Sequence, residues 1–112
     1  MADGSLPMTT ALEVPGLRIR ANIGICYGLV VRSMGFTGSF TASFKALRRG
    51  EISEYTQLLE DSRRHAIDRM VENAQLMGAD AIVAIRFDTS EIGGQFTEIV
   101  AYGTAVKAVA AE

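Results

Sequence analysis

The sequence predicts an α+β fold of two layers, in which a three-stranded antiparallel sheet packs on one long helix. Three observations lead to this fold class. Apolar residues occupy the odd positions of residues 17–31, as in a strand. Residues 55–77 carry apolar side chains at helical spacing, and residues 81–87 and 96–109 are rich in β-branched residues. The predicted order is strand, short helix, long helix, strand, strand.

Composition limits both the size of the domain and its partners. The chain has 112 residues, the length of one domain, and 48% of them are hydrophobic, so there is a core to pack. Lys and Arg total 11 against 13 Asp and Glu, and the net charge of -2 is too small to attract nucleic acid or an anionic membrane. The single cysteine predicts a reducing compartment, so we expect a soluble cytoplasmic protein.

Residues 1–9 are expected to form a flexible leader, and residues 10–112 a single domain. The opening segment is polar and rich in Gly, Ser and Pro, and Met8 is a second position at which the native chain could start. The segment lacks the basic and apolar regions of a signal peptide. The apolar run at residues 23–31 is too short to cross a bilayer.

The alternation in residues 17–31 predicts a strand whose odd-numbered side chains lie on a buried face. On the opposite face, Gly24 and Gly28 are two positions without a side chain, which indicates a bulge or the close approach of another backbone. Residues 33–49 are expected to form a short helix that ends at Gly50. Its apolar side would consist of Phe36, Phe40, Phe44 and Leu47, at spacings of 4, 4 and 3.

The long helix has the clearest pattern. Ser53 and Glu54 are the expected N-terminal cap and first acid, and Gly78 is the expected end. The apolar face consists of Tyr55, Leu59, Ala66, Ile67, Met70, Val71, Ala74 and Met77. The opposite side is a charged stripe of Glu54, Asp61, His65, Asp68 and Glu72. We expect this stripe to face solvent.

The two C-terminal strands are predicted to form a hairpin whose turn spans residues 88–95 and contains Gly93-Gly94. The last strand is apolar on both faces, with Ile99, Ala101 and Ala105 on one and Val100, Tyr102 and Val106 on the other. Ile82 and Ala84 are expected to extend the second face on the neighbouring strand. Because one helix covers only one face of a sheet, the second face predicts association, and most soluble oligomers are homo-oligomers.

Cys26 and His65 are the only cysteine and histidine of the chain. Zinc and similar metals are held by three or four thiolates or imidazoles, so one chain does not supply a site, and we expect Cys26 to be a small buried side chain. A ring of symmetry-related Cys26 thiols would be needed to bind a metal. His65 lies on one helical stripe with Asp61, Asp68 and Glu72, which are potential metal ligands. Because Arg64 and Arg69 border this stripe and no second histidine joins it, a solvated surface is favoured over a metal site. No metal site and no cofactor are therefore expected.

Arg63 falls among the apolar positions of the long helix and not on the charged stripe. A buried guanidinium needs a carboxylate or several carbonyls as partners. The expected partner is Asp80, Glu98 or a residue of a neighbouring chain, in a structural ion pair. Binding of an anion by Arg63 is the alternative.

No catalytic mechanism has identifiable parts in this sequence. The turn at residues 78–81 lacks the phosphate-loop pattern, and Gly93-Gly94 is followed by no predicted helix. Neither a Ser/His/Asp arrangement, nor a reactive cysteine beside a histidine, nor a pair of buried carboxylates can be found. We therefore do not expect an enzyme.

Three segments of the sequence resemble the YbjQ-like family of small prokaryotic proteins over about residues 10–109. They are Tyr55-x-x-x-Leu59-x-x-x-Arg63-x-x-Ala66, the run from Met77-Gly78-Ala79-Asp80 to Asp88, and Ala101-Tyr102-Gly103-Thr104-Ala105-Val106. The resemblance implies a β-α-β-β fold assembled as a ring of five, with a shape like that of dodecin subunits, and the family carries a heavy-metal-binding label. We expect structural or interface roles for Arg63, Tyr55, Asp80, Tyr102, Gly103 and Thr104.

The leading functional expectation is a non-enzymatic homo-oligomer, pentameric by the resemblance, that binds an unknown small ligand or serves as an assembly module. The alternative is a heavy-metal-binding protein whose ligands are shared between subunits. An enzyme whose site forms between subunits is a third reading. Neither nucleic acid nor a membrane is an expected partner.

Overall fold

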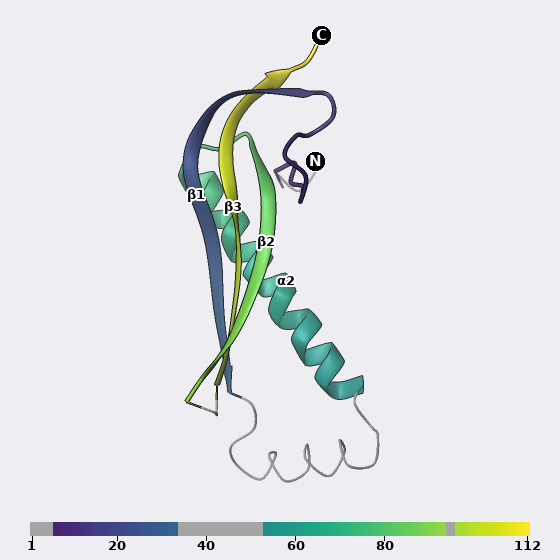
Figure 1. Cartoon of the computed structure of the whole chain (residues 1–112), viewed down its shortest axis with the longest axis vertical. Coiled ribbons are helices and arrows are strands. Elements are labelled where there is room, and N and C mark those ends of the chain that lie inside the picture. The colour runs from purple at the N-terminus through teal and green to yellow at the C-terminus, as the bar shows by residue number, and fades with distance from the viewer. Residues whose placement is uncertain (1–5, 34–52, 94–95) are drawn as a thin grey trace.

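The computed structural model describes residues 6–33, 53–93 and 96–112 (Figure 1). The three strands form one antiparallel sheet in the order β1-β3-β2, and the helix lies along one face of it. This confirms the predicted α+β class. The short helix expected at residues 33–49 falls, apart from Ser33, outside the described residues, and so does Gly50. The elements are β1 (Leu17–Ser33), α2 (Ser53–Leu76), β2 (Ala81–Ile92) and β3 (Phe96–Ala110).

The side of α2 that faces the sheet is largely the apolar face expected from the sequence. A Cβ at Gly28 of β1 would collide with the main-chain oxygen of Ala66 and the main-chain nitrogen of Met70. The close backbone approach expected at Gly28 is therefore confirmed, and it brings α2 against β1. The core between helix and sheet contains the completely buried Ala66, Met70 and Ala74, surrounded by Ile67, Val71 and Met77. No helix among the described residues is long and apolar enough to cross a membrane.

Gly78 follows α2 in a left-handed conformation, with a φ of 85°, and ends the helix as expected. The Ala79 N–H donates to the Ala74 carbonyl and the Gly78 N–H to the Gln75 carbonyl, which is the hydrogen-bond pair of a Schellman motif. Asp80 then fixes the start of β2 on β3. Its N–H donates to the Val106 carbonyl, and its carboxylate accepts a hydrogen bond from the Ala108 N–H.

β1 covers the predicted range and continues to Ser33. Its register with β3 shifts twice, so that Arg20 and Ile23 have no residue opposite them, and the second shift lies directly before Gly24. Each shift is a β-bulge, as the glycines indicated for this part of the strand. The predicted burial is wrong for the odd residues from 25 to 31, which are exposed. The helix packs on the even-numbered side because Gly28 leaves that side flat.

β2 runs to Ile92, so residues 88–92, expected in the turn, pair with β3 instead. Main-chain pairing continues through these polar residues, although no apolar alternation marks it in the sequence. A bulge lies between Val83 and Arg86, where Ala84 has a φ of 56°, a left-handed conformation that is uncommon for a residue other than glycine. Ile82 is completely buried in the core under α2. The expectation that Ile82 extends an uncovered face is therefore wrong, whereas Ala84 is half-buried at the bulge.

A second, smaller core lies on the other face of the sheet, near the start of β2. It contains Ala81, Val83 and Val106, against which Val14, Leu17 and Ile19 pack. Residues 7–11 run along the outer edge of β2, where the Ile82 N–H donates to the Pro7 carbonyl and the Thr9 N–H to the Ile82 carbonyl. Residues 7–9, expected in a flexible leader, are thus an ordered part of the sheet edge.

Candidate functional site

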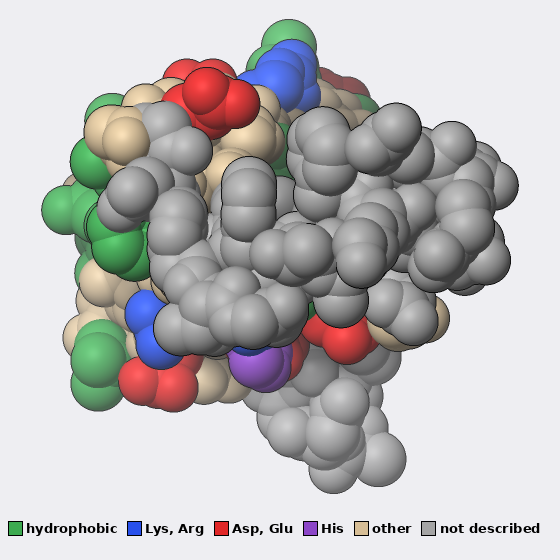
Figure 2. Space-filling model, turned by 90° about the horizontal axis from the view of Figure 1, so that it is seen from below, with side chains coloured by type: hydrophobic (Ala, Val, Ile, Leu, Met, Phe, Trp, Pro, Cys, Tyr) green, Lys and Arg blue, Asp and Glu red, His purple; other side chains and the backbone are tan. Residues whose placement is uncertain are grey.

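A row of exposed apolar side chains lies on the sheet face opposite α2. On β1, Ile25 is 68% and Tyr27 58% exposed, and Leu29 and Val31 follow them on the same side of the strand. The register places Tyr102 and Val100 of β3 beside this row. We call these residues the open face: Ile25, Tyr27, Leu29, Val31, Val100 and Tyr102. In the space-filling view, hydrophobic side chains gather along one side of the molecule (Figure 2).

The polarity of this side of the sheet changes from β1 to β2. Arg86 of β2 lies opposite Tyr102, and Asp88 lies opposite Val100. The Arg86 guanidinium donates hydrogen bonds to the Thr10 and Ile85 carbonyls, which hold it at the edge of the sheet. The open face is therefore an apolar area with a charged margin on β2. Protein interfaces commonly combine an apolar centre with a polar rim in this way.

The outer edge of β1 beside the open face is occupied by side chains of α2. The Tyr27 N–H donates to Asn73 Oδ1 at 3.0 Å, and Arg69 Nη1 donates to the Leu29 carbonyl at 2.7 Å. Unpaired strand edges invite pairing with other chains, and these bonds occupy two of the groups that would accept such a strand. At the other edge of the sheet, residues 7–11 cover the start of β2.

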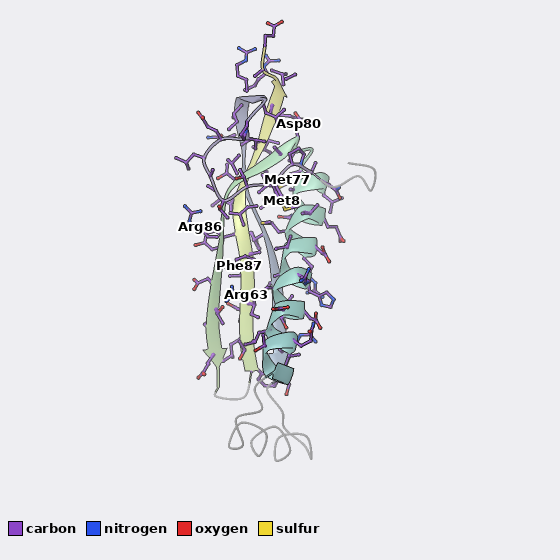
Figure 3. The ribbon with its side chains drawn as sticks, turned by 90° about the vertical axis from the view of Figure 1, so that its right-hand side faces the viewer. Met8, Arg63, Met77, Asp80, Arg86 and Phe87 are labelled. Atoms are coloured by element: carbon purple, nitrogen blue, oxygen red, sulfur yellow. The ribbon has the colours of Figure 1, made fainter. Side chains whose placement is uncertain are left out.

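Arg63 has a different partner within the chain from the carboxylate that was expected. It is exposed, and its Cζ lies 5.2 Å from the centre of the Phe87 ring (Figure 3). The Asp80 carboxylate binds the Ala108 N–H, and Glu98 accepts a hydrogen bond from Ser90 Oγ. The guanidinium thus stays in contact with water while it packs over an aromatic ring. Pairing with a neighbouring chain stays a prediction.

The charged stripe of α2 faces solvent at Asp61, His65, Asp68 and Glu72, as expected. His65 Nδ1 lies 3.3 Å from Arg32 Nη2, and Arg32 Nε donates to Ser62 Oγ at 2.8 Å. Ser62 is completely buried and donates in turn to the Leu58 carbonyl. Arg32 and Ser62 thus join the end of β1 to α2. Within the described parts of the chain, no three His, Cys, Asp or Glu residues are grouped so that they could hold a metal ion.

Cys26 is completely buried, as predicted, with its Sγ 3.6 Å from the Gly103 carbonyl oxygen. Burial raises the pKa of the Cys26 thiol, and hydrogen bonds with the main chain of Cys26 and Gly103 offset part of this effect. The thiol lies in the core under α2, on the opposite side of the sheet from the open face. In this chain the thiol reaches neither surface of the sheet.

The remaining residues expected at an interface are distributed over different parts of the fold. Tyr102 belongs to the open face, and Thr104, which is half-buried, lies opposite Ile25 on the same side of the sheet. Gly103 faces the core, where a Cβ would come within 2.9 Å of the Ile82 side chain. Asp80 lies at the turn after α2, and the Tyr55 side chain lies outside the described residues. The structure thus brings together only Tyr102 and Thr104.

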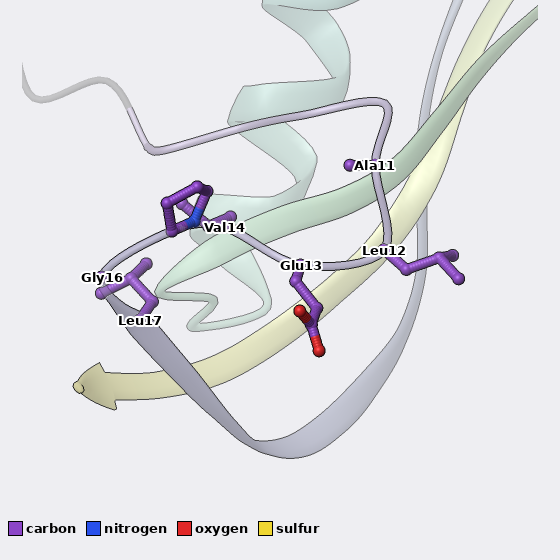
Figure 4. A pocket seen from close by; sticks show the side chains of 7 residues that line it. Ala11, Leu12, Glu13, Val14, Gly16 and Leu17 are labelled. Atoms are coloured by element: carbon purple, nitrogen blue, oxygen red, sulfur yellow. The ribbon is translucent and has the colours of Figure 1, made fainter. Parts of the chain in front are cut away.

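Two surface pockets in the described part of the chain lie away from the open face. The larger, about 640 Å³ in volume, is formed by the loop of residues 11–17 alone (Figure 4). The smaller, about 300 Å³, lies beyond the end of α2 and is lined by Arg20, Ala21, Asp80, Lys107, Ala108 and Val109. We call the smaller one the Arg20–Lys107 pocket.

Sequence reasoning missed the polar contacts between α2 and the edge of β1. Ser62 and Asn73 lie four residues before Ala66 and three after Met70, so both fall within the apolar face of the helix. A polar residue on such a face usually has a hydrogen-bond partner, and this was the available signal. Arg69 was assigned to the border of a solvated stripe, and its bond to the Leu29 carbonyl had no signal in the sequence.

Comparison with known proteins finds one family profile, YbjQ, described as "Putative heavy-metal-binding", which matches residues 6–109. A UPF0145 protein from Bradyrhizobium sp. strain ORS 278 is 54% identical over 103 residues, which are 92% of this chain and 93% of the relative. A UPF0145 protein from Burkholderia thailandensis is 49% identical over 111 residues, 99% of each chain.

A solved structure has a similar fold. It is a DUF74-family protein of unknown function from Pediococcus pentosaceus, with a TM-score of 0.61 and 17% sequence identity, and the match covers 91% of this chain and 96% of that chain. At this identity the likeness concerns the fold alone.

Proposed function

This chain belongs to the YbjQ-like family, whose description reads "Putative heavy-metal-binding", and from that premise we propose that it is a non-enzymatic homo-oligomer. The oligomer binds a small ligand or serves as a module in a larger assembly. The family resemblance implies five subunits. The single cysteine, kept as a buried thiol, supports a reducing compartment such as the cytoplasm.

The observation that carries this proposal is the open face. Exposed apolar side chains are ordinary when they are scattered singly, but here six adjacent positions on two neighbouring strands are apolar. An uncovered sheet of this kind is an aggregation hazard for a monomer. Another copy of the chain is the occupant that is always present at equal concentration, and most soluble oligomers are built from one chain.

The test is the mass of the purified protein by light scattering coupled to size exclusion, with Leu29→Glu on the open face as the variant. We expect the wild type to have a multiple of the 12.0 kDa chain mass and Leu29→Glu to have a lower mass. Leu76→Glu is the matched control, because Leu76 is 84% exposed and lies at the end of α2, away from the open face. A wild-type mass of one chain would overturn the proposal, whereas a multiple other than five would remove only the stoichiometry.

The second candidate is a heavy-metal-binding protein with ligands from several subunits, which the family description supports. Besides methionine, one protomer offers only Cys26 and His65 as soft or borderline ligands. They lie in different places, one in the core and one on the surface of α2. Calorimetry with zinc, copper and nickel on metal-stripped oligomer separates the two candidates. Tight stoichiometric binding that Cys26→Ser or His65→Ala abolishes would favour the metal-binding function.

A further inference from the structure

The Arg20–Lys107 pocket lies where the sheet continues beyond its helix. α2 ends at Leu76, while β1 and β3 extend past this point (Figure 1). Asp80 stands near this end of the helix (Figure 3) and takes part in the lining of the pocket. Small apolar residues of the two strands complete the lining, namely Ala21, Ala108 and Val109. The pocket is therefore a hollow whose charged side chains come from β1, β3 and the turn after α2.

Arg20 lies at a β-bulge beside this pocket. Consecutive side chains of a regular strand point to opposite faces, and a bulge breaks this alternation. In β1, Ile19 lies opposite Ala108 and Ala21 opposite Lys107, which leaves Arg20 as the extra residue between them. Bulges of this kind redirect a side chain locally. Arg20 and Ala21 both line the pocket, and so does Lys107.

The charges of the pocket are not balanced. Arg20 and Lys107 carry two positive charges, and Asp80 carries one negative charge. Asp80 Oδ2 is committed to the Ala108 N–H at 3.0 Å, which holds the carboxylate in a fixed orientation. Within the described part of the chain, neither Arg20 nor Lys107 forms an ion pair with a carboxylate. Two cationic residues thus line one hollow that contains a single carboxylate.

We propose that the Arg20–Lys107 pocket binds a small anion that carries a carboxylate or phosphate group. The guanidinium of Arg20 is the planar donor fork that suits these groups, and Lys107 adds a second positive charge to the lining. The volume of about 300 Å³ is at the lower limit for small-molecule sites, which restricts the ligand to a short acid or a small phosphate. The Asp80 carboxylate favours a ligand that also has a hydroxyl or amino donor.

The test is an NMR titration of the ¹⁵N-labelled full-length protein with inorganic phosphate and, separately, with citrate, at constant ionic strength kept with sodium chloride. We expect saturable shifts of the Ala21 and Ala108 amide signals with at least one of the two probes. Saturation with citrate alone identifies a carboxylate ligand, and saturation with phosphate alone identifies a phosphate ligand. Arg20→Gln and Lys107→Gln should each weaken binding by about tenfold, the loss of one charge-assisted hydrogen bond.

Arg64→Gln is the matched control, since it removes one positive charge from an exposed position on α2 outside the pocket. Shifts that grow linearly with both probes, or equal binding by all three variants, would overturn the proposal. This site does not depend on the proposed self-assembly, because none of its lining residues belongs to the open face. A monomeric protein that binds phosphate would refute the assembly alone, and an oligomer without saturable binding would refute the pocket alone.

Discussion

Gly28 is the position at which the structure makes its sharpest energetic prediction. The helix and β1 approach so closely there that a Cβ would meet three atoms of α2: the Ala66 oxygen, the Met70 nitrogen and, at 2.7 Å, the Arg69 Cβ. Two of these belong to the backbone of the helix and the third is fixed to it. No side-chain rotation relieves the contact, so in Gly28→Ala the helix itself has to move.

The cost follows from how far α2 must retreat. Carbon atoms reach their optimal separation at about 3.5–4 Å, so a retreat of about 1 Å is needed, and a gap of that size forfeits a quarter to a half of the dispersion energy along the interface. The interface holds Met70, Ala66 and Ala74, all completely buried. We expect overpacking to lower the free energy of unfolding by about 3 kcal/mol. Replacing a glycine within a strand raises it again by only about 0.5–1 kcal/mol.

The assay is denaturant unfolding followed by circular dichroism, at one fixed protein concentration because association contributes to apparent stability. We expect Gly28→Ala to lose about 2 kcal/mol of unfolding free energy and Gly28→Ser to lose more. Gly16 is the control: its φ of 86° disfavours any side chain, but nothing lies within 4 Å of its Cβ position, so Ala and Ser should cost the same there. Wild-type stability in Gly28→Ser would refute the placement of α2 against β1.

Two further predictions concern Arg63 and Cys26. Because Arg63 is exposed and packs over Phe87, Arg63→Ala should lower the free energy of unfolding by about 0.5–1 kcal/mol. The control Arg64→Ala should leave the free energy of unfolding unchanged. A loss of about 3–5 kcal/mol for Arg63→Ala would instead reveal a buried carboxylate partner from another subunit. Burial raises the pKa of the Cys26 thiol above its ordinary value, so alkylation of the native protein at pH 8 should be much slower than in denaturant. Because the unfolded thiol loses its proton first, this group should leave stability unchanged where both forms are protonated and lower it as the pH rises through the ordinary thiol pKa. Native labelling at the unfolded rate would contradict the burial.

The fold could be predicted from the sequence because each long element carries its own periodicity. The spacing of Ala66, Met70 and Ala74 selects the buried side of α2, and Gly78 marks its end. The buried side of β1 could not be predicted by the same reasoning. Larger apolar residues occupy its odd positions, but the helix packs on Gly28 and Cys26, where a flat surface allows the closest approach.

The apolar sheet face opposite the helix was predicted in part. The sequence indicated an apolar sheet face opposite the helix, and Tyr102 and Val100 are indeed on it. The contribution of β1 was missed, because Tyr27 and Leu29 had been assigned to the core. Which of the two faces a helix covers depends on tertiary packing, and alternation along one strand shows that two faces differ without showing which is covered.

The positions of Cys26 and His65 also bear on the choice between assembly and metal binding. A ring of Cys26 thiols would require each thiol to leave a core in which it is completely buried, on the side of the sheet away from the open face. His65 is accessible, but the Arg32 guanidinium stands 3.3 Å from its Nδ1, and a fixed positive charge at that distance opposes a metal cation. Either site would therefore have to displace an existing contact before it gained a ligand. Association through the open face displaces none, which is why the proposed function rests on the sheet and not on the thiol or the imidazole.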